Sequence, residues 1–251
     1  MMLGARTGAW AKRGGGVPTA RDYVQDGLIA MWDGIENAGW GVHDSAATVW
    51  KDLSGNGWDF SLNPDKNRVS FGDSYINMKN VAANGVCAAY TPNGFIGNGY
   101  SCLEIVYEPY NKTMDIFNPG GNSQFENSDF GFYASLTYIQ LGTQNGKDRW
   151  RYAFDSENNK PYYAACNIDK NNGNIHYGFV NGVPVNRTDS SASTGYYRGT
   201  HSSIGGRYTN GFVADFGASG KIFALRLNNR FLTDAEIAAN YAIDKARFNL
   251  P

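Results

Sequence analysis

The stretch HYGFVNGVPVN (residues 176–186) carries the clearest signal for the fold of this chain. Val180 and Val183 flank the dipeptide Asn181-Gly182. This dipeptide readily takes positive φ at both central positions of a type I′ turn, the turn that best matches the twist of two paired strands. The stretch therefore predicts a β-hairpin centred on residues 181–182.

Strand-like segments continue on both sides of this hairpin, from Asp26 for about 200 residues. Residues alternate between apolar and polar in RVSFGDSYINM (68–78) and YSCLEIVYEPY (100–110), and Gly, Asn and Asp separate such segments. Short strands punctuated by these turn residues indicate a sandwich or a barrel rather than βαβ units.

One helix is expected at the end of the chain, in FLTDAEIAANYAIDKARFNLP (231–251). Thr233 and Glu236 have the spacing of a capping box, and Leu232 and Ile237 that of a hydrophobic staple. Ile237, Tyr241 and Phe248 favour one face. We expect a helix over 233–248 that packs its apolar side on the sheets.

The composition suits such a fold and excludes several classes of function. Of the 251 residues, 14% are aromatic, 18% are charged and 31 are glycine. A net charge of −1 without a wide basic patch argues against nucleic-acid binding. No apolar run approaches the roughly 18 residues of a membrane-spanning helix.

The first residues, MMLGARTGAWAKRGGGVPTARDY (1–23), form a Gly-rich, mildly basic segment. Lys12 and Arg13 fall where a secretory signal would need an apolar stretch of about 7 to 15 residues, so no signal peptide is expected. We predict an N-terminal arm over residues 1–22 and a single sandwich domain, with its terminal helix, over residues 23–251.

Five motifs in order resemble the laminin-G-like branch of the concanavalin A-like lectin/glucanase superfamily. They are DLSGNGWDF (52–60), FGDSYINM (71–78), LEIVYEP (103–109), NIHYGFVNGVPV (174–185) and the closing IGGRY (204–208) with GKIFALRLNNRFLTDAEIAANY (220–241). The resemblance runs from about Asp26 to Phe248. It implies an all-β fold, a jelly-roll sandwich of two antiparallel sheets, one of them concave.

Some members of this superfamily are glycoside hydrolases, whose acids stand on one strand as Glu-x-Asp-x-x-Glu or a close variant. The nearest stretch here has Glu104 and Glu108 but Val106 at the central position. Residues four apart on a strand lie roughly 13 Å apart, beyond the roughly 5 to 9.5 Å between paired glycosidase acids. His43, His176 and His201 belong to no catalytic or metal motif. We therefore expect a chain that is not an enzyme.

A glycan-binding surface is the first hypothesis, because sugars are bound by an aromatic platform with polar side chains beside it. We select Trp150, Tyr152 and Tyr138 as candidate ligand-binding residues. About half of the aromatic residues in these strands must point into the core instead, since neighbours on a strand face opposite sides.

No cofactor is required, but the loop with Asp52, Asn56 and Asp59 offers the oxygen ligands that Ca²⁺ prefers. The same side chains also suit Asx-turn hydrogen bonds to their own backbone. Cys87, Cys102 and Cys166 lack metal-type spacing, and Cys102 and Cys166 are expected to be buried free thiols. One disulfide remains an alternative.

Two settings follow for the chain. In the first it is a non-catalytic carbohydrate-binding or adhesion module on a virion, such as that of a bacteriophage, or on a cell surface. In the second it is a structural protein of such an assembly, docked on other subunits through residues 1–21. The two settings are compatible, and they differ in where the affinity lies.

Overall fold

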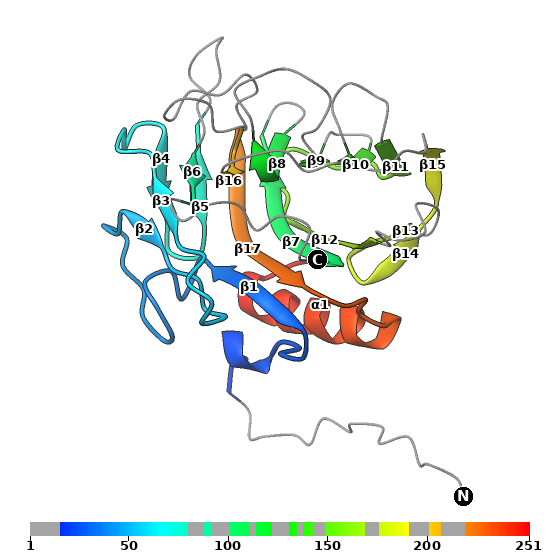
Figure 1. Ribbon diagram of the computed structural model, residues 1–251, viewed down its shortest axis with the longest axis horizontal. Helices are drawn as coiled ribbons and strands as arrows, with labels where there is room; N and C mark the ends of the chain where they lie inside the picture. Colours follow the sequence, from blue (N-terminus) through cyan, green and yellow to red (C-terminus); the bar gives the residue numbers. More distant parts are fainter. Residues whose placement is uncertain are drawn as a thin grey trace, which may run out of the picture.

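The computed structural model describes residues 16–79, 88–91, 101–110, 114–121, 131–134, 138–142, 149–168, 176–190, 201–206 and 219–251. Within these ranges the chain forms two antiparallel sheets that face each other, with one α-helix against the outside of one sheet (Figure 1). The predicted fold class, an all-β antiparallel sandwich with a short C-terminal helix, is confirmed.

The sheet next to the helix, called the helix-side sheet below, contains eight strands in the described part of the chain. Seven follow one path: β14 (Val183–Val185), β13 (His176–Val180), β12 (Tyr162–Ile168), β7 (Cys102–Pro109), β17 (Gly220–Asn228), β5 (Ile76–Met78) and β4 (Val69–Phe71). The eighth, β1 (Leu28–Asp33), shares one edge of β17 with β5: β5 pairs with residues 220–222 and β1 with residues 224–228.

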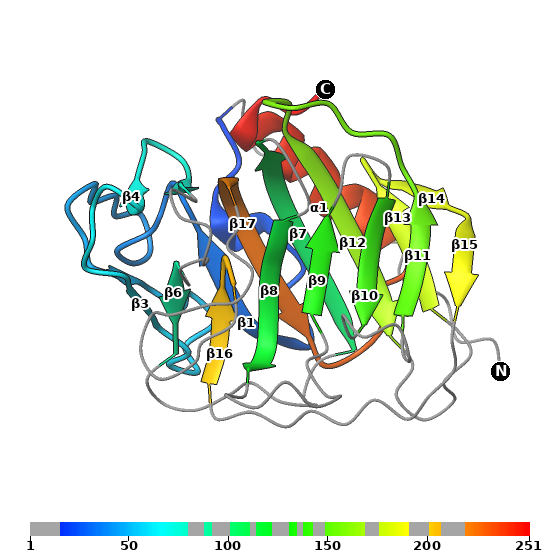
Figure 2. The same cartoon turned by 90° about the horizontal axis from the view of Figure 1, so that it is seen from above.

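The opposite sheet has nine strands within the described residues. Their order is β15 (Arg187–Ser190), β11 (Arg149–Ala153), β10 (Tyr138–Gly142), β9 (Gly131–Ala134), β8 (Met114–Gly121), β16 (His201–Ile204), β6 (Ala89–Tyr90), β3 (Phe60–Leu62) and β2 (Val49–Trp50). Figure 2 shows β8 to β11 side by side in one layer, with the helix behind them.

Large aromatic side chains fill the space between the sheets. The ring centroids of Trp32 and Phe60 are 4.6 Å apart, and Trp50 meets Phe71 edge to face at 6.0 Å. All four side chains are buried, as are Leu103, Ile105 and Tyr107 of β7. The alternation in β7 puts its odd-numbered residues into this core and leaves Cys102, Glu104 and Val106 on the helix side.

The helix α1 (Asp234–Phe248) begins as the sequence predicts. The hydroxyl of Thr233 accepts a hydrogen bond from the backbone N–H of Glu236, and the Glu236 carboxylate accepts one from the backbone N–H of Thr233. Leu232, Ile237 and Phe248 are buried in a second apolar cluster against Cys102, Val106 and Phe179 of the helix-side sheet. The helix ends at Asn249, which has the left-handed conformation that favours a C-terminal cap.

The predicted hairpin is also confirmed. β13 and β14 pair with Val180 opposite Val183, and Asn181 and Gly182 have φ of 48° and 73°. Cys102 and Cys166 are buried free thiols, as expected, whereas Cys87 lies outside the described residues. No helix among the described residues is long and apolar enough to cross a membrane.

Residues 18–23 contact the rest of the domain through backbone and side-chain hydrogen bonds. Thr19 caps a short 3₁₀ helix, η1 (Ala20–Asp22), and both Ala20 and Tyr23 are buried. The backbone N–H of Ala20 donates to Glu36, and Arg247 of α1 donates to the carbonyl of Pro18. Residues 18–22 therefore pack against the sandwich, while the division into an arm over 1–22 and a domain over 23–251 stays a prediction.

Candidate functional site

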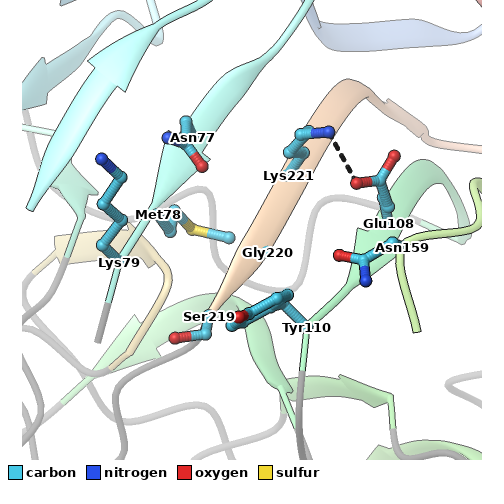
Figure 3. A pocket seen from close by; sticks show the side chains of 9 residues that line it. All are labelled: Asn77, Met78, Lys79, Glu108, Tyr110, Asn159, Ser219, Gly220 and Lys221. Carbon is cyan, nitrogen blue, oxygen red and sulfur yellow. Dashed lines mark hydrogen bonds and ion pairs between the residues drawn. The ribbon is translucent and has the colours of Figure 1, made fainter. Parts of the chain in front are cut away.

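An open pocket of about 440 Å³ lies on the helix-side sheet, where β7 ends, β17 begins and β5 runs beside them. Its walls combine aromatic, amide, charged and small residues (Figure 3). They are Asn77, Met78, Lys79, Glu108, Tyr110, Asn159, Ser219, Gly220 and Lys221.

The strand register brings three polar residues of the pocket into one row. Lys221 of β17 stands opposite Asn77 of β5 on one side and opposite Glu108 of β7 on the other. Ile222 and Tyr107, the next residues on β17 and β7, belong to the core. Because neighbours on a strand face opposite sides, Asn77, Glu108 and Lys221 face away from the core and toward solvent.

Lys221 and Glu108 hold each other in place within this row. The Lys221 ammonium donates to Glu108 Oε1 at 2.6 Å and lies 4.8 Å from the centroid of the Tyr75 ring. Both side chains are partly exposed, so the pair adds on the order of 1 kcal/mol or less to stability. Its consequence for the site is positional, because it fixes a carboxylate and an ammonium at one wall of the pocket.

Tyr110 supplies the aromatic surface. The residue is 52% exposed, and Phe231 is the other large aromatic residue that is exposed in the described part of the chain. The backbone around Tyr110 is tied down: the N–H of Tyr110 donates to the carbonyl of Ser219, and the N–H of Asn159 donates to the carbonyl of Pro109. Asn159 has a φ of 58°, a left-handed conformation that asparagine tolerates better than most residues. A ring on a fixed backbone loses little entropy when a ligand packs on it.

The pocket therefore offers a platform for an apolar face and several groups for polar ones. Amides of Asn77 and Asn159 both donate and accept hydrogen bonds, the Ser219 hydroxyl does the same, and the ammonium groups donate only. This is the combination that a carbohydrate needs, with C–H groups on one face of its ring and hydroxyls around the rim.

The ligand-binding residues predicted from sequence do not line this pocket but lie on β10 and β11 of the opposite sheet. Tyr152 of β11 is 1% exposed and lies in the core, where its ring leaves no room for a side chain at Gly178. Burial also raises the pKa of its phenol. Tyr152 is a packing residue and cannot form a surface platform, which corrects that part of the prediction.

Trp150 and Tyr138 are placed in the described structure only by their backbone. Trp150 of β11 stands opposite Leu141 of β10, and Tyr138 of β10 stands opposite Ala153 of β11. Their side chains lie outside the described residues.

The loop considered for Ca²⁺ uses its oxygens for hydrogen bonds. The two carboxylate oxygens of Asp52 accept from the backbone N–H groups of Met31, Ser54 and Trp58, and Asp59 accepts from the N–H of Asp52 and from Lys51. The Asn56 side chain donates to the carbonyl of Ile29. These donors occupy the positions that a cation would need, so the loop matches the Asx-turn alternative.

The described residues contain no cluster of three or more His, Cys, Asp and Glu side chains arranged to hold a metal.

The two acids considered for hydrolysis have separate surroundings. Glu104 is fully buried under α1, where it accepts hydrogen bonds from Tyr163, Asn240 and Arg226. Glu108 lies at the other end of β7 and pairs with Lys221. Burial and the Glu104 carboxylate together raise the pKa of Tyr163. Glu104 thus serves the contact between helix and sheet.

Sequence reasoning did not select the pocket, because its residues come from four separate stretches of the chain. One signal was available. Tyr110 follows Pro109 directly at the end of an alternating strand, and a proline at this position is typical of a strand end. An aromatic residue immediately after a strand end is a candidate for exposure.

No protein-family model matches this sequence, and no curated protein matches it either. Solved structures do match the fold. Trypanosoma rangeli sialidase in complex with sialic acid superimposes with a TM-score of 0.56 at 17% identity, over 92% of this chain and 34% of the sialidase. This chain thus spans about a third of the sialidase's length.

Domain 4 of AbnA, an extracellular GH43 arabinanase from Geobacillus stearothermophilus, also matches, in a complex with arabinotriose. Its TM-score is 0.58 at 14% identity, over 86% of this chain and 98% of that domain. At these identities the likeness shows a shared β-sandwich fold.

Proposed function

We propose that this chain is a non-catalytic carbohydrate-binding module and that the pocket around Tyr110 holds the sugar. The observation that carries the proposal is the exposed ring of Tyr110 beside Asn77, Asn159 and Ser219 in one open pocket. A pyranose or furanose ring would stack its C–H face on the phenol and direct its hydroxyls to the amides.

The fold supports this proposal without deciding it. A domain of the same architecture and nearly the same extent is in complex with arabinotriose. The five motifs of the laminin-G-like type point in the same direction, and we place the chain in that branch of the concanavalin A-like superfamily as part of the proposal.

The absence of catalysis is proposed on the surroundings of the two acids. A glycosidase acid must reach the scissile bond, whereas Glu104 is covered by α1 and held by Arg226 and Asn240. Glu108 faces the pocket, but its partner there is the Lys221 ammonium rather than a second carboxyl group.

A glycan array with the full chain tests the proposal, once with Ca²⁺ and once with a chelator. We expect a defined set of glycans to bind and Tyr110→Ala to weaken binding by about tenfold or more, from the loss of both ring contact and buried area. Tyr110→Phe keeps the ring and should keep most of the affinity.

Phe231→Ala is the matched control, because Phe231 is also an exposed aromatic residue but lies outside the pocket. No binding across a broad array would contradict the proposed function. Binding that Tyr110→Ala leaves intact would place the sugar elsewhere and contradict the proposed site. Equal binding with and without Ca²⁺ is expected, because donors occupy the carboxylates of residues 52 and 59.

We propose further that the module is presented on a virion or a cell surface, with residues before Pro18 as the docking element. The observation that favours this second role is the anchoring of residues 18–23: Arg247 binds the carbonyl of Pro18, and Tyr23 binds Asp244, both on α1. Pro18 is therefore held at a defined point beside α1.

A deletion of residues 1–15 tests the docking role without removing these anchors. We expect incorporation into the assembly to be lost while glycan binding stays unchanged. Unchanged incorporation would contradict a docking role for this segment. A longer deletion through residue 21 would also remove buried Ala20 and would not separate docking from stability.

A further inference from the structure

We infer that the pocket selects acidic saccharides over neutral ones, and that Lys79 is the residue that contacts the acidic group. This inference rests on the proposed function, since it names the class of sugar for the same pocket. The ligand chemistry is an anionic substituent, a carboxylate or a sulfate, on a ring that stacks on Tyr110.

The charges of the pocket carry the inference. Among its described lining residues are two ammonium groups, Lys79 and Lys221, and a single carboxylate, Glu108. Glu108 and Lys221 form an ion pair of 2.6 Å and largely compensate each other. The lining therefore keeps an excess of one positive charge, which belongs to Lys79.

The position of Lys79 fits this role. It follows Met78, whose side chain is 3% exposed and packs in the core, so the alternation of β5 puts Asn77 and Lys79 on the opposite, outer side. The backbone N–H of Lys79 donates to the carbonyl of Arg68, which fixes the base of this exposed side chain. Figure 3 shows Lys79 on the β5 side of the pocket, with Lys221 and Tyr110 on the far side.

A sugar in this pocket would partly desolvate the ammonium of Lys79. A hydrogen bond to a neutral hydroxyl offsets little of that desolvation energy. A carboxylate or sulfate offsets more of it through a charge-assisted hydrogen bond, which is about twice as strong as a neutral one. Glu108 adds the opposite constraint, because a second anionic group near the β7 wall would meet its carboxylate. The pocket is thus matched to a ring that carries one acidic substituent.

Matched sugars that differ only at C6 separate charge from shape. Methyl glucuronide has a carboxylate where methyl glucoside has a hydroxymethyl group, and methyl glucoside 6-sulfate carries a sulfate there. We would titrate each into the intact chain and follow binding by NMR. We expect the glucuronide, the sulfate or both to bind about fivefold more tightly than the neutral glucoside at low salt, the range of a partly exposed ion pair.

Variants at Lys79 identify the contact. Lys79→Gln should bring the ratio of the acidic-sugar affinity to the neutral-sugar affinity close to one, and Lys79→Arg should retain the preference. Lys245→Gln, on α1 and outside the pocket, removes one positive charge from the chain and should change neither affinity. The preference should also decrease as ionic strength rises, because an exposed pair is screened by salt.

The outcomes separate this inference from the proposed function. Equal binding of acidic and neutral sugars, reduced alike by Tyr110→Ala, would overturn the inference and leave the carbohydrate-binding function standing. A preference that survives Lys79→Gln would overturn the assignment of the contact to Lys79. A complete lack of binding, here and on the array, would contradict the proposed function itself.

Discussion

Replacing Arg226 by methionine should cost about 3 to 5 kcal/mol of unfolding free energy, because it leaves two buried carboxylates without their cation. Arg226 is 1% exposed and lies between the helix-side sheet and α1. Its Nε donates to Glu104 at 3.2 Å, and its terminal nitrogens donate to the two oxygens of Asp244 at 3.1 and 2.6 Å. The Tyr23 ring lies 4.0 Å from the guanidinium and donates its hydroxyl to Asp244.

The magnitude follows from what the substitution leaves behind. Methionine roughly preserves the volume, so packing changes little. Asp244 keeps the hydrogen bond from Tyr23 but loses both bonds from Arg226 and stays buried. The loss is about a fifth or more of the roughly 5 to 15 kcal/mol by which an ordinary domain is stable.

The loss of unfolding free energy in Arg226→Met should depend on pH, and the direction of this dependence follows from the shift of the Asp244 pKa. Burial raises the pKa of Asp244, and Arg226 opposes that rise. Without Arg226 the pKa rises further. A carboxyl group with a raised pKa in the folded state contributes stability at low pH that is lost as pH rises. The variant should therefore be penalised more at pH 7 than at pH 5.

Urea unfolding followed by circular dichroism measures this difference. Lys51→Met is the control, because Lys51 and Asp59 form a pair of 2.6 Å at the surface, where about 1 kcal/mol or less is expected. A loss at Arg226 no larger than at Lys51, or a larger loss at pH 5 than at pH 7, would refute the account of the helix contact.

Two further predictions concern the first turn of α1 and the turn of the hairpin between β13 and β14. The hydrogen bond from Arg230 lowers the pKa of Glu236 to about 2 from 4.5, so the ionised carboxylate stabilises the fold above pH 4.5 and this stabilisation is lost as pH falls toward 2. Glu236→Gln should therefore reduce the change in unfolding free energy between pH 5 and pH 2.5, and an unchanged dependence on pH would contradict this. Gly182→Ala should destabilise the chain by about 2 kcal/mol in urea unfolding, since the φ of Gly182 is 73° and a Cβ would lie 2.7 Å from the Tyr241 ring. Gly55→Ala is the control: Gly55 has a φ of 87° but open space around it, so only the backbone strain of about 1 kcal/mol is expected. Equal losses would argue against the contact with Tyr241.

The fold was predictable because local and long-range signals agree. Asn181-Gly182 determines a hairpin by its own backbone preference, and Thr233 with Glu236 determines a helix start. Both depend on neighbours within a few positions. The alternation of β7 similarly separates Leu103 and Ile105 from the helix side of the sheet.

The candidate site was not predictable by the same means. A period of two shows that Tyr152 and its strand neighbours face opposite sides, but it does not show which side is the core. The structure puts Tyr152 inside and exposes Tyr110, which the alternation alone would not distinguish. The pocket further depends on the pairing of Lys221 with Asn77 and with Glu108 across three strands that are distant in sequence.

The polar residues under α1 illustrate the same limit. From the sequence alone, Glu104 would be expected at the surface, as carboxylates usually are. Its separation from Glu108 along the strand argues against a catalytic pair but does not indicate another role. Its actual role appears once Arg226 and Asn240 are brought onto it by β17 and α1. Charged residues in an alternating strand mark the face away from the core, but a helix can cover that face.

A crystal structure with the tightest glycan from the array tests the central claim most directly. The account predicts a sugar ring stacked on Tyr110, with polar contacts to Asn77 or Asn159 and an acidic substituent at the Lys79 ammonium. A sugar bound instead over β10 and β11 of the nine-stranded sheet would contradict it.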